Sequence, residues 1–230
     1  MRVEKQKAIK LRKQGKSYSQ IREQLNIPKS TLSFWLCDLK ISKEAQNTIH
    51  SRAYKKSTEA LIKRNKQQTV LAKERADAIR KTSRKEVSEL MKNNLFVSGI
   101  SLYWAEGYKK GANGSRWKCV DFANSDPEMI LVMMKFFRKI CNIPIGKIRA
   151  QVIAHENVDI ESAVKYWSKH TGISIDRFIK TTLPKQRISK NKRKNSNLTH
   201  GTLHIRINDV GFFFRIIGWI DGLKDYLKGL

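Results

Sequence analysis

Acidic residues are scarce in this 230-residue chain, which has 47 Lys and Arg, 20 Asp and Glu, and a formal net charge of +27. Both halves share the excess: residues 1–94 hold 24 basic and 9 acidic residues, and residues 95–230 hold 23 and 11. This even distribution argues against a neutral enzyme that merely carries a basic tail. It favours a protein whose partner is a polyanion, most often nucleic acid.

Cysteines and long apolar runs are also few. The three cysteines, Cys37, Cys119 and Cys141, are far apart, and no Cys-x-x-Cys pair occurs. Reduced thiols are therefore expected, with neither a disulfide framework nor a cysteine-based metal site. The longest apolar run, 95–105, is too short to span a bilayer, and the charged start MRVEKQKAIK lacks a signal-peptide core. We expect a cytoplasmic protein, nucleoid-associated or organellar, with no membrane partner.

Glycine and proline are absent from residues 43–94, which are rich in Lys, Glu, Gln, Ala and Arg. This composition predicts one or two extended basic helices. We interpret the segment as a helical linker between an N-terminal domain, 1–42, and a second domain, 95–230, both of which contact DNA. A solvated spacer that is partly disordered when free is the alternative.

Three short helices are predicted before this linker. Residues 4–14 have an apolar face and end at Gly15, which suits the position after a helix. Ser17 stands three residues before Gln20, the spacing of a capping box that begins a second helix. After a short turn, Pro28 suits the first position of a third helix.

The exposed face of that third helix carries small donors and acceptors plus a cation: Lys29, Ser30, Thr31 and Ser33. Such side chains reach base edges and phosphates from a helix N-terminus. The stretch GKSYSQIREQLNIPKSTLSFWL resembles the helix-turn-helix of resolvase-type and sigma-factor-type DNA-binding domains. The resemblance implies binding to double-stranded DNA through these four residues. A three-helix bundle without a DNA role is the alternative.

From residue 95 the pattern alternates between helical and extended segments. It predicts a mixed α+β domain with a small antiparallel sheet. The expected helices are 95–107, 126–142, 160–172 and 210–227, and the expected strands are 117–125, 146–155, 177–184 and 201–208. The last two strands are expected to pair with each other.

The helix predicted at 95–107 combines small residues with a terminal acid. Ser101 and Ala105 lie four apart on one face, and Ser98 and Gly99 add small groups, which lets two helix backbones approach closely. Glu106 falls at the C-terminal end, where the helix dipole is negative and a cation is favoured. Two such ends brought together require a divalent metal or a proton. A solvated helix end is the alternative for Glu106.

The motif GISLYWAEG, followed by VDFANSD and PEMILVMMKFFRKI, resembles the LAGLIDADG homing-endonuclease family over residues 95–155. The resemblance implies an αββαββα-type domain and a homodimer that packs through Ser101 and Ala105. It also implies that Glu106 is catalytic and holds Mg²⁺ for phosphodiester hydrolysis.

Three functions follow as expectations. The first is a site-specific, Mg²⁺-dependent DNA endonuclease of homing type, and the alternative is a non-catalytic DNA-binding transcriptional regulator on the same fold. The third is a transposase or integrase with an acidic triad drawn from Asp121, Asp176 and Asp209.

A basic run at 184–200 lies in the long acid-free stretch between Asp176 and Asp209. We expect a loop that contacts DNA phosphates, with a solvated loop as the alternative. Its basic residues are Lys185, Arg187, Lys190, Lys192, Arg193 and Lys194. The histidines His155, His200 and His204 are candidate ligands or general bases. Asp221, in the WIDG echo of the WAEG motif, is interpreted as the polar end of the closing helix.

Overall fold

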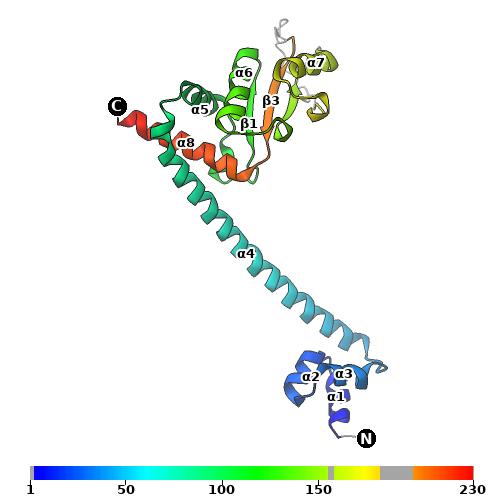
Figure 1. Cartoon of the computed structure of the whole chain (residues 1–230). Coiled ribbons are helices and arrows are strands. Elements are labelled where there is room, and N and C mark those ends of the chain that lie inside the picture. The colour runs from blue at the N-terminus through cyan, green and yellow to red at the C-terminus, as the bar shows by residue number, and fades with distance from the viewer. Residues whose placement is uncertain (1–2, 155–157, 182–198, 230) are drawn as a thin grey trace, which may run out of the picture. The chain divides into compact units, whose positions relative to one another are not determined.

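The computed structural model describes residues 3–154, 158–181 and 199–229, and the chain divides into two compact units, Met1–Ala72 and Lys73–Leu230. The chain is mixed α+β (Figure 1), and the described part contains one three-stranded antiparallel sheet, in the second unit. Among the described residues, no helix combines the length and the apolar character needed to cross a bilayer.

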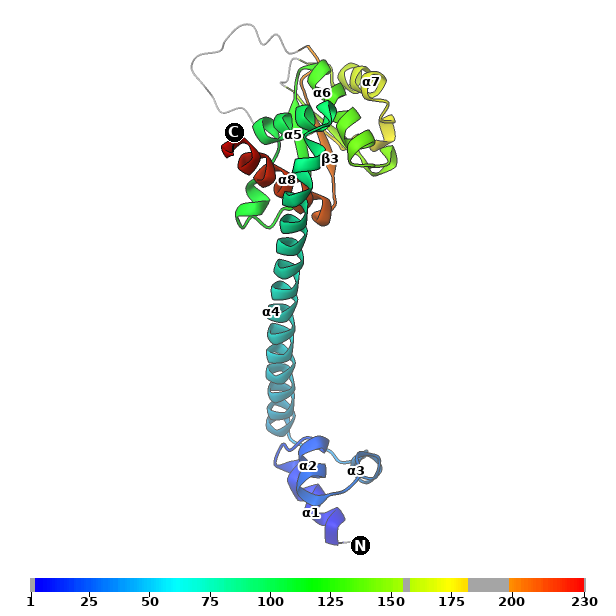
Figure 2. The same ribbon diagram turned by 60° about the vertical axis from the view of Figure 1, so that its left-hand side comes forward.

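Three short helices form the beginning of the first unit: α1 (Val3–Lys13), α2 (Tyr18–Leu25) and α3 (Lys29–Leu36). They contact one another (Figure 2) around a small apolar core made of Ala8, Ile21, Ile27, Leu32 and Leu36. The predicted capping box is confirmed, because Ser17 Oγ accepts from the backbone N–H of Gln20 at 3.3 Å and Gln20 Oε1 accepts from that of Ser17 at 2.9 Å. The capping box fixes where α2 begins.

The glycine- and proline-free segment forms one helix, α4 (Lys43–Leu90), as the composition predicted. Its first turns pack beside the three short helices: Ala45 is buried, and Arg52 Nη1 donates to the carbonyl of Gly15 at 3.2 Å. The residues from Lys73 onward belong to the second unit, where Ser83 and Val87 are buried. The expected boundary at residue 95 thus lies inside this unit, and the end of α4 is part of its core.

The second unit alternates helices and strands along the chain. Its main elements are α5 (Asn94–Glu106), β1 (Val120–Asn124), α6 (Pro127–Lys135), β2 (Arg149–Ile153), α7 (Ile160–Thr171), β3 (Thr202–Ile207) and α8 (Val210–Lys228). Asp126 caps α6, accepting from the backbone N–H of Glu128 at 2.8 Å. A π-helical turn, Phe136–Ile140, continues α6.

The expected pairing of 177–184 with 201–208 is not what the described residues form. β3 lies in the centre of the sheet, antiparallel to both β1 and β2. Within the described part of 177–184, Phe178 forms a single parallel bridge with Ala150, and Ile179 N donates to the Ala150 carbonyl at 2.7 Å. The described order is therefore α5-β1-α6-β2-α7-β3-α8, in place of the expected αββαββα order. A central strand pairs its backbone N–H and C=O groups along both edges, whereas each strand of an isolated hairpin pairs them along one edge only.

One face of the sheet closes the core of the second unit. Val120, Phe122, Ile205 and Val152 are buried on it, and β1 contacts α5, α6 and α8 (Figure 1). Tyr103 of α5 is fully buried in the same core, where its hydroxyl donates to the carbonyl of Tyr108 at 3.0 Å.

α8 packs against the end of α4 through two glycines, Gly218 and Gly222, and through ion pairs. Asp221 pairs with Arg80, and Asp225 with Arg84. The interpretation of Asp221 as the end of the closing helix is wrong, since α8 continues to Lys228. The partner of Asp221 is a residue of the segment that the sequence assigned to the linker.

Candidate nucleic-acid interface

The N-terminal candidate surface is the solvent face of α3. Lys29, Ser30 and Ser33 are exposed, Thr31 is half-buried, and Phe34 is 79% exposed. The opposite face of the helix, Leu32 and Leu36, is buried in the small core. The sequence therefore separated the two faces of α3 correctly, and its polar face is available to a ligand.

A second candidate surface is the sheet face that points away from the core. Residues directly opposite each other in antiparallel strands share a face, so the register assigns eight residues to this one. We call it the polar sheet face; it consists of Asp121, Ala123, Arg149, Gln151, Ile153, Thr202, His204 and Arg206. Arg149 is exposed, and 21% of the His204 and Arg206 side chains is exposed, so solvent reaches this face.

The polar sheet face carries two arginines side by side. Arg206 on β3 stands opposite Arg149 on β2 and opposite Asp121 on β1. Like charges directly opposite each other in a sheet are destabilising. Only one of the two arginines has a carboxylate opposite it, so the face keeps a positive charge that the fold does not require.

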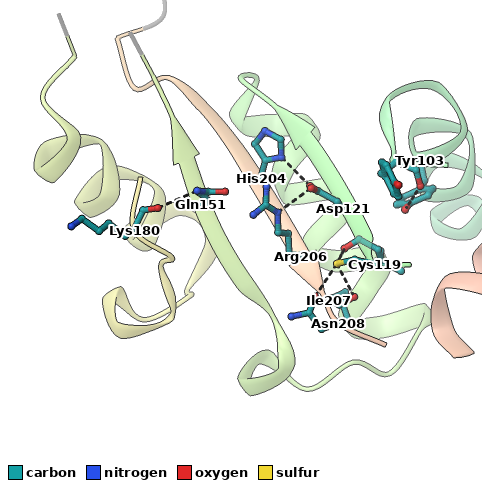
Figure 3. A network of polar contacts seen from close by, with 11 residues as sticks. Tyr103, Cys119, Asp121, Gln151, Lys180, His204, Arg206, Ile207 and Asn208 are labelled. Atoms are coloured by element: carbon teal, nitrogen blue, oxygen red, sulfur yellow. Dashed lines mark hydrogen bonds and ion pairs between the residues drawn. The ribbon is translucent and has the colours of Figure 1, made fainter. Parts of the chain in front are cut away.

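Asp121 connects the polar side chains of this face (Figure 3). Its Oδ1 lies 3.0 Å from His204 Nδ1, and its Oδ2 accepts from Arg206 Nε at 3.0 Å. The guanidinium of Arg206 also lies over the ring of Trp117, 5.7 Å from the ring centroid. Gln151, at the other side of His204, donates from Nε2 to the carbonyl of Lys180 at 3.1 Å. These side chains are held in fixed positions before any ligand binds.

The end of α5 is attached to the edge of the same sheet. Gly107 forms an antiparallel bridge with Phe122, and Tyr108 N donates to the carbonyl of Asp121 at 2.8 Å. Glu106, the last residue of α5, is exposed beside this attachment. The predicted catalytic acid therefore lies at the β1 edge of the sheet.

A lysine donates hydrogen bonds to the backbone carbonyl groups at that helix end. Lys109 Nζ donates to the carbonyls of Trp104 at 2.9 Å, Ala105 at 3.4 Å and Gly107 at 2.6 Å. Burial lowers the pKa of Lys109, and the nearby Glu106 carboxylate opposes that shift. The negative end of the helix dipole is thus compensated by an ammonium group of the chain itself.

One copy of this chain offers few protein ligands to the Mg²⁺ that the LAGLIDADG resemblance implies. Mg²⁺ takes six oxygen ligands in octahedral geometry, of which one or two are usually carboxylates and the others are waters and substrate phosphates. The described residues contain no group of three or more His, Cys, Asp or Glu side chains that could hold an ion. Glu106 is a single carboxylate, and the carbonyls beside it bind Lys109.

The small-residue face of α5 is exposed in part. Ser98, Ser101 and Ala105 lie on the surface, and a shallow apolar depression between α5 and α6 adjoins them. Gly99 is not part of this face, which corrects its expected place with the interface residues. A Cβ on Gly99 would lie 2.3 Å from Phe136 Cγ, so this glycine allows close packing inside the unit.

The structure separates the acids of the expected transposase triad. Asp121 binds His204 and Arg206, whereas Asp209 caps α8 by accepting from Phe212 N at 2.8 Å. Asp176 accepts from Ser174 Oγ at 2.5 Å. Each acid has a local structural partner, and the three do not form a cluster.

Of the remaining candidate residues from the sequence, His200 is described by the structure and the others are not. His200 stacks on Tyr166 with ring centroids 3.7 Å apart, which is a packing role. The others lie outside the described residues, and they are His155, Lys185, Arg187, Lys190, Lys192, Arg193 and Lys194.

Sequence reasoning missed the polar sheet face as a surface. A signal was present in the alternation of polar residues at 149 and 151 and at 202, 204 and 206. Alternation shows that a strand has a polar face, but only the register shows that Arg149 and Arg206 become neighbours.

No family model, curated protein or solved structure matches this chain. The function is therefore inferred from the geometry and charge of the residues described above.

Proposed function

We propose that this chain binds double-stranded DNA through both of its units. The observation that carries the proposal is the pair Arg149 and Arg206, side by side on a solvent-reached sheet face in a chain of net charge +27. A polyanion neutralises such a pair, and phosphate contacts supply most of the affinity of DNA-binding proteins.

Both surfaces have shapes that DNA grooves admit. The major groove accepts an α-helix or a two-stranded β-ribbon, and sheet-based readers place strands in a groove. We infer that α3 acts as the recognition helix of a helix-turn-helix, with Lys29, Ser30, Thr31 and Ser33 toward DNA. The polar sheet face forms the second contact, and the basic residues at 185–194 are proposed to add phosphate contacts.

Fluorescence anisotropy on a labelled 30-base-pair duplex tests the proposal. The double variant Arg149→Ala/Arg206→Ala should weaken binding and reduce the log–log salt slope by about 1 to 2, since each phosphate contact that is lost contributes about 0.9. The matched control Arg138→Ala/Lys139→Ala removes two exposed cations of the same unit and should leave the slope close to that of the unaltered chain. Equal slopes for the two double variants would show that the polar sheet face does not contact DNA.

A parallel pair tests the first unit. Ser30→Ala/Ser33→Ala should weaken binding without lowering stability, because both side chains are exposed. Ser162→Ala in α7 removes an exposed hydroxyl of the other unit and serves as a control for binding. Unchanged affinity in the α3 variant would exclude α3 from the interface.

Site-specific cleavage by a homodimer of the LAGLIDADG type is the second candidate function. The observation that favours it is the exposed Glu106 at the β1 edge, next to the exposed Ser101 and Ala105. One chain contributes one such carboxylate, so the reaction requires a second copy packed on the same face. A DNA-binding regulator requires neither the carboxylate nor the second copy.

Nicking of a supercoiled plasmid carrying the chain's own flanking DNA, with and without Mg²⁺, separates these functions. A nuclease should lose cleavage in Glu106→Gln and keep it in Glu128→Gln, a matched change at an exposed acid of α6. Cleavage retained in Glu106→Gln would remove Glu106 from the reaction. Binding without cleavage by the unaltered chain would assign the regulator function.

A further inference from the structure

A carboxylate on a surface that contacts DNA needs a reason to be there. Asp121 is only 6% exposed, yet it belongs to the polar sheet face, opposite Arg206. A negative charge there repels phosphates and lowers the affinity for DNA of any sequence. Its contribution must therefore come from what it does to its neighbours.

Asp121 binds two side chains that stand two residues apart on the central strand. Its two carboxylate oxygens are divided between His204 Nδ1 and Arg206 Nε, each at 3.0 Å. Charge-assisted hydrogen bonds of this kind are stronger than neutral ones. Asp121 therefore fixes both side chains at once, from the edge strand β1.

The terminal nitrogens of the Arg206 guanidinium are available to a ligand. A guanidinium has five N–H donors in a rigid fork, and in the described part of the chain Arg206 makes its hydrogen bond through Nε. The four donors on the terminal nitrogens can therefore bind a ligand. The Trp117 ring, 5.7 Å away, contacts the guanidinium as well, so the orientation of the fork is fixed from two directions.

The distance between alternate residues along β3 matches the length of two base-pair steps in B-DNA. Residues two apart on a strand are separated by about 6.7 Å, at about 3.3–3.4 Å per residue. Two base-pair steps of B-DNA cover about 6.8 Å, at about 3.4 Å each. His204 and Arg206, which share a face, can thus each face a different base pair of one short site.

We propose that Asp121 is a positioning residue that holds Arg206 and His204 for reading base edges in duplex DNA, with guanine as the base that Arg206 reads. The inference rests on the DNA binding proposed above. An arginine fork donates two hydrogen bonds to the O6 and N7 atoms of guanine, a contact that depends on orientation. A fork fixed in advance loses less conformational freedom when it binds. Asp121 thus lowers general affinity and raises discrimination.

The test begins with selection from a randomised double-stranded oligonucleotide library by the full chain. The enriched duplex should contain a fixed guanine, and its replacement by 7-deazaguanine, which lacks the N7 acceptor, should weaken binding about tenfold. In Asp121→Asn the same replacement should change affinity less than twofold. Affinity for an unrelated duplex should stay the same or rise, since a negative charge has been removed.

Two further variants keep the test decisive. Arg206→Lys retains the charge and loses the fork, so it should also lose the guanine preference even if Asp121→Asn fails to fold. Asp176→Asn is the matched control, an exposed acid of the same unit outside the polar sheet face, and it should keep the tenfold effect. Thermal melting of each variant is measured in parallel, because a purely structural role would change stability and leave the preference intact.

The outcomes separate the two proposals. If the unaltered chain binds no duplex at all, the proposed function fails, and the role of Asp121 fails with it. If it binds DNA while Asp121→Asn and Arg206→Lys keep the full guanine preference, only the positioning role is overturned. A uniform loss of affinity on every duplex in Arg206→Lys would assign Arg206 to a phosphate and would also overturn the base-reading role.

Discussion

Gly218 of α8 lies so close to Arg80 of α4 that a Cβ on this glycine would stand 2.4 Å from the carbonyl oxygen of Arg80. One turn later, a Cβ on Gly222 would stand 2.4 Å from the carbonyl oxygen of Arg84. Residues four apart share one face of a helix. The two glycines therefore let the backbones of α8 and α4 meet, and the neighbouring Asp221 binds Arg80 across the contact.

Alanine at either glycine should destabilise the second unit. The added methyl group meets a backbone carbonyl that cannot move aside, and overpacking of this kind costs about 1–3 kcal/mol. Urea unfolding followed by tryptophan fluorescence measures the change for Gly218→Ala and Gly222→Ala. Gly146→Ala is the control: its Cβ would lie 3.6 Å from Arg177 Nη2, so its effect should stay within about 0.5 kcal/mol. Equal stability of all three variants would contradict the close contact.

The end of α4 should be required for the second unit to fold. Val87 is buried in its core, and Glu86 Oε2 accepts from Trp219 Nε1 at 2.8 Å. A fragment 73–230 should therefore melt cooperatively, whereas 95–230 exposes the glycine face of α8 and should lose the cooperative transition. Circular dichroism with temperature compares the two fragments. A cooperative melt of 95–230 at the same temperature would show that the domain begins at residue 95 after all.

Helix boundaries were predictable because they depend on neighbours in sequence. Ser17 and Gln20 are three residues apart, and Asp126 caps the turn that immediately follows it. A few dihedral angles and one short hydrogen bond decide such features, and their sequence patterns are strong. The uninterrupted α4 was equally predictable, because no residue in 43–90 breaks a helix.

The pairing of distant segments was not predictable in the same way. β3 was recognised as a strand, but nothing in its residues selects β1 and β2 over residues 177–184 as partners. Asp121 is 83 residues from His204, and Gly218 meets a helix that the composition assigned to a linker. Such contacts are decided by the summed burial of the whole unit, which no local pattern contains. The polar sheet face therefore became visible only with the register.

The three thiols should differ in reactivity. Cys37 is exposed, whereas Cys119 and Cys141 are buried. At pH 8 an aromatic disulfide reagent should modify one thiol of the native chain rapidly and all three in urea. Cys37→Ser should leave no rapidly reacting thiol. Two rapid thiols in the native chain would show that the core of the second unit opens readily.

Alkaline pH should weaken the folded state through the buried thiols. Burial raises the pKa of Cys119 from 9.0 to about 11, and it raises the pKa of Cys141 as well. The unfolded chain therefore releases these protons at a lower pH than the folded chain does. This contribution to stability is complete below about pH 9 and is lost as pH rises toward 11. Melting temperatures across that range test the sign, and a rise would contradict it.

Loss of the capping box should lower the stability of the first unit. Ser17→Ala removes the acceptor for the backbone N–H of Gln20, and such a loss costs about 0.5–2 kcal/mol of stability. Ser30→Ala is the matched change at an exposed serine, and its effect on stability should be within about 0.5 kcal/mol. Urea unfolding of the fragment 1–72 measures both. Equal destabilisation by the two variants would contradict the cap.

The small exposed face of α5 gives the last prediction, which concerns the proposed homodimer. Ser98, Ser101 and Ala105 leave room for a second helix backbone beside α5, and a long charged side chain in the centre of that face would prevent the approach. Sedimentation equilibrium should therefore find a dimer for the unaltered chain and a monomer for Ser101→Arg. Ser88→Arg makes the same change at an exposed serine of α4 and should leave the dimer intact. Because both variants add the same positive charge, a difference between them reports the contact and not general repulsion. A Ser101→Arg chain that still sediments as a dimer would place the interface elsewhere, and Glu106 of one copy would then have no matching carboxylate beside it.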